Sequence, residues 1–221
     1  MNHSPLKIDF HVHTRYSHDS NTSLREVLVY AKRRGLDGVA ITDHDTVEGG
    51  LKLSKLCRKK GFSFIVIQGF EVSSKHGHIL ALNVSEPVRP GRDIVETIEE
   101  IHDKGGLAVL SHPFSFFKGI PLRELMRAKE ADAIEVINSC AIPFSISTRL
   151  GMEYARALKL PELAGSDAHI PEVIGLSYCE VYSDPEVEEV LKAVKKGYTR
   201  PYGSGISIYE RIKAFLRNRK S

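Results

Sequence analysis

Short apolar segments that end in a histidine or an acidic residue recur along this chain, with helical segments between them. The first is Ile8-Asp-Phe-His-Val12, whose alternating apolar residues predict a strand. Residues two apart in a strand share a face, so His11 and His13 point the same way at its end. Imidazole is a strong ligand for zinc, manganese and iron. This opening therefore predicts a metal-binding edge of a sheet.

Later apolar segments end in the same way. Residues 37–41, 62–71, 107–111 and 163–165 predict strands, and residues 76–82, 131–138 and 177–182 predict three more. Polar side chains lie at the ends of most of them, where barrel enzymes place their sites. The candidate metal ligands are His11, His13, His18, His44, Glu71, His78, His112, Asp167 and His169.

Helical patterns separate the predicted strands. Ser23 and Glu26 form a capping-box signal for a helix that ends before Gly35, and other helices are expected at 46–60, 93–104, 121–129, 144–158 and 185–196. Such alternation predicts an α/β fold with a parallel sheet, right-handed crossovers and a closed or nearly closed barrel. We expect residues 1–221 to form a single domain. Its C-terminal amphipathic helix, about 206–219, should turn Ile208, Ile212 and Phe215 toward the barrel.

Composition narrows the possible partners. A formal charge of +3 is too small to indicate nucleic-acid binding without a clustered patch. The three cysteines lie far apart and suggest neither a disulfide framework nor a cysteine zinc site. No apolar segment approaches the length of a membrane helix, and the N-terminal residues carry no signal-peptide pattern. We therefore expect a cytoplasmic protein without a membrane partner.

The candidate ligands outnumber those that one ion needs, because a single ion takes about four to six. Two or three divalent ions are therefore expected, with Glu71 as the natural carboxylate bridge between two of them. Histidine and carboxylate ligands suit zinc, manganese and iron alike. The identity of the metal stays open at this point.

The motifs resemble those of a known family. The segments are His11-x-His13-Thr, Thr42-Asp-His44-Asp, Gly69-x-Glu71, His78-Ile-Leu, His112-Pro113 and Gly165-Ser-Asp-Ala-His169. In this order they look like the successive motifs of the PHP (polymerase and histidinol phosphatase) family. The resemblance implies a distorted (β/α)7 TIM-like barrel, a trinuclear metal site and hydrolysis of phosphoesters. It also implies that Glu71, Asp167 and His112 serve in catalysis.

The resemblance further implies how three ions would be held. One ion would take His11, His13, Glu71 and Asp167, a second Glu71, His78 and His112, and a third His18, His44 and His169. At the third site many relatives carry Asp where this chain has His18, and Asp19 follows directly. Either residue is a candidate, because adjacent side chains in a tight turn diverge. We favour His18, since imidazole is the commonest ligand for these ions, with Asp19 orienting a liganding imidazole.

The expected activity is that of a phosphoesterase acting on a small phosphate monoester or a nucleotide through a metal-bound hydroxide. Arg149, Lys75, Lys118 and Arg200 lie on or near predicted loops and are candidates for binding the substrate phosphate. One alternative is a metal-dependent amidohydrolase, which usually needs a bridging lysine where this chain has Glu71. Another is a non-catalytic, nucleic-acid-associated relative that would use the basic tail, residues 211–220.

Overall fold

The structure is a computed structural model that describes residues 4–218. Its strands are β1 (Leu6–Val12), β2 (Gly38–Ile41), β3 (Ile65–Ser74), β4 (Gly77–Leu82), β5 (Leu107–Leu110), β6 (Ala133–Asn138), β7 (Glu162–Gly165), β8 (Ser177–Val181) and β9 (Thr199–Gly203). Its helices are α1 (Leu24–Arg33), α2 (Glu48–Lys60), α3 (Ile94–Asp103), α4 (Leu122–Arg127), α5 (Phe144–Leu158), α6 (Val187–Lys195) and α7 (Ile208–Asn218), with a 3₁₀ turn at Pro171–Val173. None of the described helices is long and apolar enough to span a membrane.

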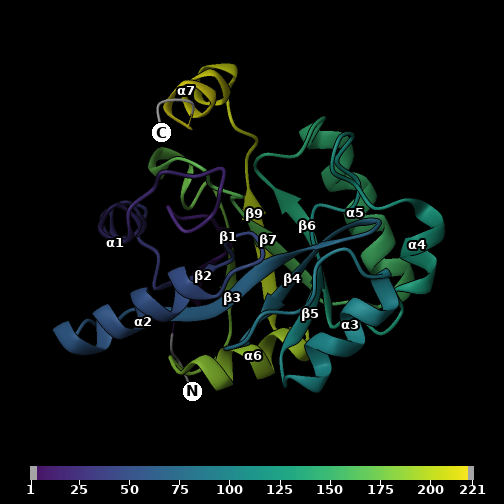
Figure 1. Ribbon diagram of the computed structural model, residues 1–221, viewed down its shortest axis with the longest axis horizontal. Coiled ribbons are helices and arrows are strands. Elements are labelled where there is room, and N and C mark those ends of the chain that lie inside the picture. The colour runs from purple at the N-terminus through teal and green to yellow at the C-terminus, as the bar shows by residue number, and fades with distance from the viewer. Residues whose placement is uncertain (1–3, 219–221) are drawn as a thin grey trace.

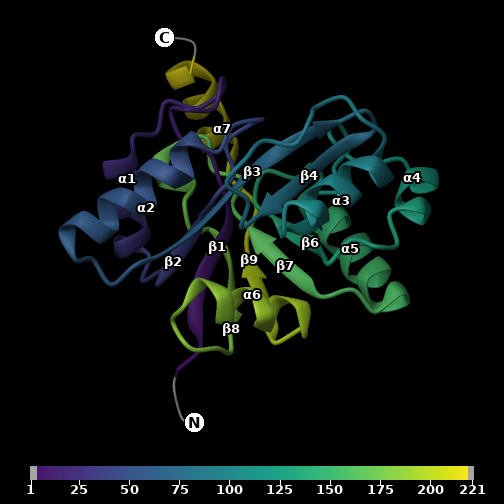
Figure 2. The ribbon, with the colours of Figure 1, turned by 60° about the horizontal axis from the view of Figure 1, so that its bottom comes forward.

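The strands form one curled sheet of nine strands, in the order β7-β6-β5-β4-β3-β2-β1-β8-β9. The segment after β7 reaches β1, where the amide of Asp167 donates to the carbonyl of His11 at 2.8 Å and Val12 pairs with Ala168. Helices lie around the outside of the sheet (Figures 1 and 2). The result is a nearly closed barrel of the distorted TIM type, which confirms the predicted fold class.

The sheet is mixed, so the expectation of parallel pairing was only partly right. Strands β1–β3 and β5–β7 pair in parallel, but β4 is antiparallel to both β3 and β5, and β8 is antiparallel to β1 and β9. Only Lys75 and His76 connect β3 to β4. Two residues permit a hairpin, whereas a parallel pair needs a crossover of about a dozen residues. The short connection therefore dictates the reversal.

Helix α1 begins where the sequence predicts. The Ser23 side chain accepts the amide of Glu26 at 3.2 Å, and the Glu26 carboxylate accepts the amide of Ser23 at 2.8 Å. The chain leaves the helix through Gly35, whose φ of 69° lies in the left-handed region. These local contacts fix where α1, the connection between β1 and β2, begins and ends.

Strand β1 is buried on both faces. Ile8, Phe10 and Val12 pack into the apolar core, and Asp9 and His11 on the other face are also fully buried. His11 contacts side chains from β3 and β6, so this second face looks into the barrel. The alternation in the sequence thus separates an apolar packing face from a polar interior face.

Helix α7 exists, but its expected orientation was wrong. Ile208, Ile212 and Phe215 are 78%, 54% and 57% exposed instead of packed inward. The helix is held by its basic side chains: Lys213 Nζ lies 2.8 Å from Glu172, and Arg217 Nη2 lies 2.7 Å from Glu26 of α1. It lies beyond one end of the sheet, at the top of Figure 1. Arg219 and Lys220 of the basic tail lie outside the described residues.

Candidate metal centre

The strand ends bring the predicted ligands together at one mouth of the barrel. His11 lies in β1 and His13 directly after it, and Glu71 and His78 lie in β3 and β4. The segments that follow β2, β5 and β7 contribute His44, His112, Asp167 and His169. His112 and Asp167 have φ values of 29° and 54°, which non-glycine residues seldom adopt. Such strained backbone is typical of functional sites, where it aims a side chain. Here it turns both side chains toward Glu71 and the β1 histidines.

One group of four atoms has the dimensions of a metal site. His11 Nε2 lies 3.0 Å from His13 Nε2, and each nitrogen lies 3.4 Å from Glu71 Oε2. Asp167 Oδ1 lies 3.5 Å from His11 Nε2 and 3.2 Å from His13 Nε2. Ligands of a tetrahedral ion with bonds of about 2.1 Å are about 3.4 Å apart. All four side chains are buried, and they are the ligands expected for the first ion.

The two carboxylate oxygens of Glu71 face different histidines. Oε1 lies 2.9 Å from His78 Nδ1 and 3.0 Å from His112 Nε2. Oε2 faces the β1 pair and lies 3.4 Å from His44 Nδ1. Glu71 thus has the arrangement expected of a carboxylate that bridges two ions.

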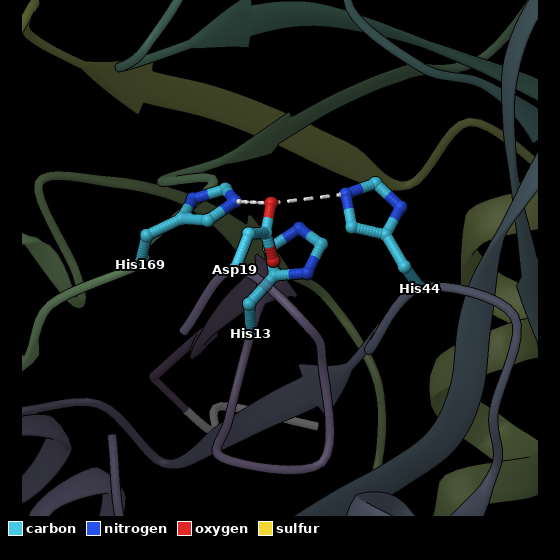
Figure 3. A group of neighbouring side chains, drawn as sticks. All are labelled: His13, Asp19, His44 and His169. Atoms are coloured by element: carbon cyan, nitrogen blue, oxygen red, sulfur yellow. Dashed lines mark hydrogen bonds and ion pairs between the residues drawn. The ribbon is translucent and has the colours of Figure 1, made fainter. Parts of the chain in front are cut away.

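A third group forms around Asp19 (Figure 3). Asp19 Oδ2 lies 2.8 Å from His169 Nε2 and 3.3 Å from His44 Nε2, with His13 beside them. His18 is exposed instead, and its ring lies 5.0 Å from that of His44. The structure therefore revises the preference for His18: in this turn the carboxylate of Asp19, not the His18 imidazole, enters the cluster.

Glu135 is a buried residue at the centre that the sequence reasoning missed. Its Oε1 lies 3.0 Å from His11 Nδ1, and its Oε2 accepts the amide of His112 at 2.8 Å and Asn138 Nδ2 at 2.9 Å. A proton on His11 Nδ1 leaves Nε2 free to bind an ion. The signal was a single acidic residue inside the apolar strand Ile134-Glu-Val136.

The charges of the cluster are strongly coupled. Burial by itself lowers the pKa of His11, but the carboxylates of Glu135, Asp167 and Glu71 raise it well above its ordinary value. Burial alone would raise the pKa values of Glu71 and Asp167, but the charge of His11 and hydrogen bonds from histidines lower both. The carboxylates of Glu71 and Asp167 are therefore ionised.

Three buried atoms of the cluster have close polar neighbours at most and no well-formed hydrogen bond: His112 Nδ1, His44 Nδ1, which lies 3.4 Å from Glu71 Oε2, and Asp167 Oδ1, which lies 3.2 Å from His13 Nε2. Buried polar atoms are nearly always satisfied, by protein, water or an ion. Converging nitrogen and carboxylate donors with unsatisfied lone pairs fit divalent ions well.

A cavity of about 530 Å³ opens directly beside the cluster. Asp19, His112, Asp167 and His169 form one wall, and Lys118 and Arg211 contribute the basic groups of its lining. The Asp167 carboxylate raises the pKa of Lys118, so its ammonium stays charged. The described residues thus place a partly apolar hollow, with two basic side chains in its lining, next to the candidate ligands.

The other expected phosphate-binding residues do not line this cavity. Arg149 is exposed on α5, with Nε 4.0 Å from Glu153, and Arg200 lies over the ring of Tyr202 at 5.3 Å. Lys75 is exposed in the turn between β3 and β4. Of the four candidates, only Lys118 borders the cluster.

The chain is similar in sequence to known proteins. A family model for the PHP domain matches residues 9–201. An uncharacterised protein of Methanocaldococcus jannaschii is 35% identical over 148 residues, covering 61% of this chain and 82% of that protein. The phosphoribosyl 1,2-cyclic phosphate 1,2-diphosphodiesterase of Eggerthella lenta is 37% identical over 84 residues, covering 35% of this chain and 31% of that enzyme.

The fold is also shared with a solved structure. A two-domain protein of Bacteroides vulgatus, said to contain a predicted PHP-like metal-dependent phosphoesterase, superposes with a TM-score of 0.75 at 17% identity. The match covers 97% of this chain and 70% of that protein. At this identity the likeness shows the fold. The match to the family model spans most of the sequence, and on that ground the chain belongs to the PHP domain family.

Proposed function

We propose that this chain is a metal-dependent phosphoesterase that hydrolyses a small phosphate monoester or a nucleotide. The observation that carries the proposal is Glu71, whose two oxygens face separate groups of imidazoles at distances of 2.9–3.4 Å. Membership of the PHP family and the cavity beside the cluster, whose lining includes Lys118 and Arg211, support it. The named activity of the Eggerthella lenta relative, a phosphodiesterase, is of the same chemical class.

Two or three ions of zinc, manganese or iron would occupy the cluster. We assign the first to His11, His13, Glu71 and Asp167, the second to Glu71, His78 and His112, and the third to Asp19, His44 and His169. In this proposal the catalytic role of Glu71, Asp167 and His112 is to hold the ions in place. Glu135 fixes the ring of His11 through its second nitrogen.

When bound, clustered divalent ions lower the pKa of a coordinated water to about 7 and bind phosphate oxygens. Lys118 lies in the lining beside His112 and Asp167 and adds a positive charge for the phosphate. Cys140 also lines the cavity, but burial raises its pKa, which keeps it a thiol and a poor nucleophile. Cys140 is therefore a poor candidate for a covalent enzyme intermediate, and the proposed nucleophile is a metal-bound water.

The nucleic-acid alternative gains little from α7. Arg211 donates to two backbone carbonyls, Lys213 pairs with Glu172, and Arg217 pairs with Glu26. These contacts use the basic side chains to hold the helix on the barrel. No stripe of unpaired basic groups remains on this helix among the described residues.

A phosphatase screen tests the proposed function. Purified protein, stripped of metal and reloaded with manganese, zinc or iron, would be offered sugar phosphates, nucleotides and short oligonucleotides. Release of phosphate that requires added metal supports the proposal. Hydrolysis of amide substrates alone, with no phosphate released under any metal, would contradict it and favour the amidohydrolase reading.

A further inference from the structure

The cavity beside the cluster is lined by apolar side chains as well as by candidate metal ligands. Phe117 of the loop after β5, Ile142 after β6 and Phe215 of α7 line it. Its volume, about 530 Å³, falls within the range of about 300–1,000 Å³ that is typical of small-molecule sites. The space therefore suits the leaving group of an ester whose phosphate sits at the metal centre.

Two aromatic rings on separate segments border this space. Phe117 is 77% exposed and Phe215 is 57% exposed. Exposed aromatic side chains that come together around a hollow mark a binding surface, because covering them with an apolar ligand removes their area from water. Aromatic rings also stack on flat ligand rings.

Arg211 adds a third flat group to this lining. Its guanidinium donates to the carbonyl oxygens of Cys140 at 3.2 Å and Ala141 at 3.5 Å, which fixes α7 against the loop after β6. Within residues 4–218 it forms no ion pair with a carboxylate. A guanidinium held by neutral partners keeps its charge and stacks well on aromatic rings.

From these observations we infer that the cavity is a subsite for an aromatic ring in the leaving group, with Phe117, Phe215 and Arg211 as its recognition residues. This rests on the proposed function and narrows its substrate to phosphate esters that carry such a ring. The ring belongs either to a nucleotide base or to an aryl ester. Helix α7 is then a wall of the active site rather than a structural appendage.

A matched pair of substrates isolates the ring. A nucleoside 5′-monophosphate and ribose 5-phosphate release the same kind of primary alcohol, so their chemistry is alike and only the base differs. The metal-loaded protein should show a kcat/KM for the nucleotide higher by about 10-fold, the size of one stacking contact. Equal values for the pair would overturn the inference. Phenyl phosphate is a third substrate, in which the ring is bonded directly to the ester oxygen. If Phe215→Ala lowers kcat/KM for this ester alone, the ring that the cavity binds is that of an aryl ester.

Variants locate the effect. Phe117→Ala and Phe215→Ala should each lower kcat/KM for the nucleotide or aryl ester by about 10-fold, mainly through KM, and leave ribose 5-phosphate unchanged. Leu216→Ala, also on α7, and Phe62→Ala remove exposed apolar side chains that do not line the cavity, and they should alter neither substrate. An equal loss on both substrates in the Phe117 and Phe215 variants would mean a structural role and contradict the inference.

A binding experiment separates this inference from the proposed function. Ligand-observed NMR with adenosine, phenol and ribose needs no turnover. Adenosine or phenol should contact the wild-type protein and lose that contact in Phe117→Ala and Phe215→Ala, whereas ribose should not bind. If both phosphate esters are hydrolysed but neither ring compound binds, the function stands and the subsite fails. If a ring compound binds but no phosphate is released, the subsite stands and the function fails.

Discussion

At the scale of single residues, the turn at residues 17–20 decides which side chain enters the cluster. Ser17 Oγ donates to Asp19 Oδ1 at 2.8 Å, which leaves Asp19 Oδ2 facing His169 and His44. The next residue back, His18, is exposed, and its ring lies 5.0 Å from that of His44. The Asp19 carboxylate therefore enters the cluster, whereas the His18 imidazole stays exposed beside it.

This turn gives a paired prediction. Asp19→Ala should lower the metal content of the reconstituted protein by about one ion per chain, because it removes the only carboxylate assigned to the third ion. His18→Ala should leave the content unchanged and serves as the control. Elemental analysis of both proteins checks this. Loss of an ion in His18→Ala alone would show that the imidazole is the ligand after all.

Glu135 makes a second prediction about single residues. Glu135→Gln keeps the size of the side chain but weakens its hold on His11 Nδ1, so metal affinity should fall by about 10- to 100-fold while the fold persists. Glu130→Gln, at an exposed position, is the matched control. Competition titration with a metal-binding dye would measure both, and wild-type affinity in Glu135→Gln would rule out the orienting role.

At the scale of elements, local sequence signals predicted where a helix begins better than they predicted which face of a helix packs against the barrel. The capping box of α1 lies within four residues, so the sequence contains all of its partners. The amphipathic pattern of α7 suggested an inward apolar face, but Glu26 and Glu172 attach the helix by its basic side chains. Those acidic partners are distant in sequence and give no local signal. The apolar side chains of α7 remain exposed, with Phe215 beside the cavity.

The cap itself can be tested through stability. Ser23→Ala removes the side-chain acceptor for the Glu26 amide and should lower the free energy of unfolding by about 1 kcal/mol. Ser85→Ala replaces an exposed serine after β4 and should have almost no effect. Urea denaturation followed by circular dichroism compares the two. A cap variant as stable as the control would mean that packing alone sets the start of α1.

At the scale of the whole molecule, the barrel was predicted from the alternation of strands and helices, and most of the cluster from residue types at strand ends. Histidine and carboxylate side chains that repeatedly follow apolar strands are unusual, and they predict that these side chains lie together on one face of the barrel. Glu135 was missed because it lies within a strand, and the mixed sheet was missed because strand direction depends on the β3–β4 connection. The cavity was beyond prediction, since its lining comes from segments as distant as Phe117 and Phe215. The single-domain organisation of residues 1–221 and the cytoplasmic location stay predictions.

The central claim is that ions bridged by Glu71 hydrolyse a phosphate ester. Its most direct test is the rate of phosphate release by wild-type protein and Glu71→Gln as manganese is added to the metal-free chain. The amide keeps the size of Glu71 but loses the charge that holds two ions close together. The wild-type rate should rise from zero to a plateau with added metal, and Glu71→Gln should stay inactive at every concentration although it folds normally. Phosphate release without metal, or wild-type turnover by Glu71→Gln, would contradict the account.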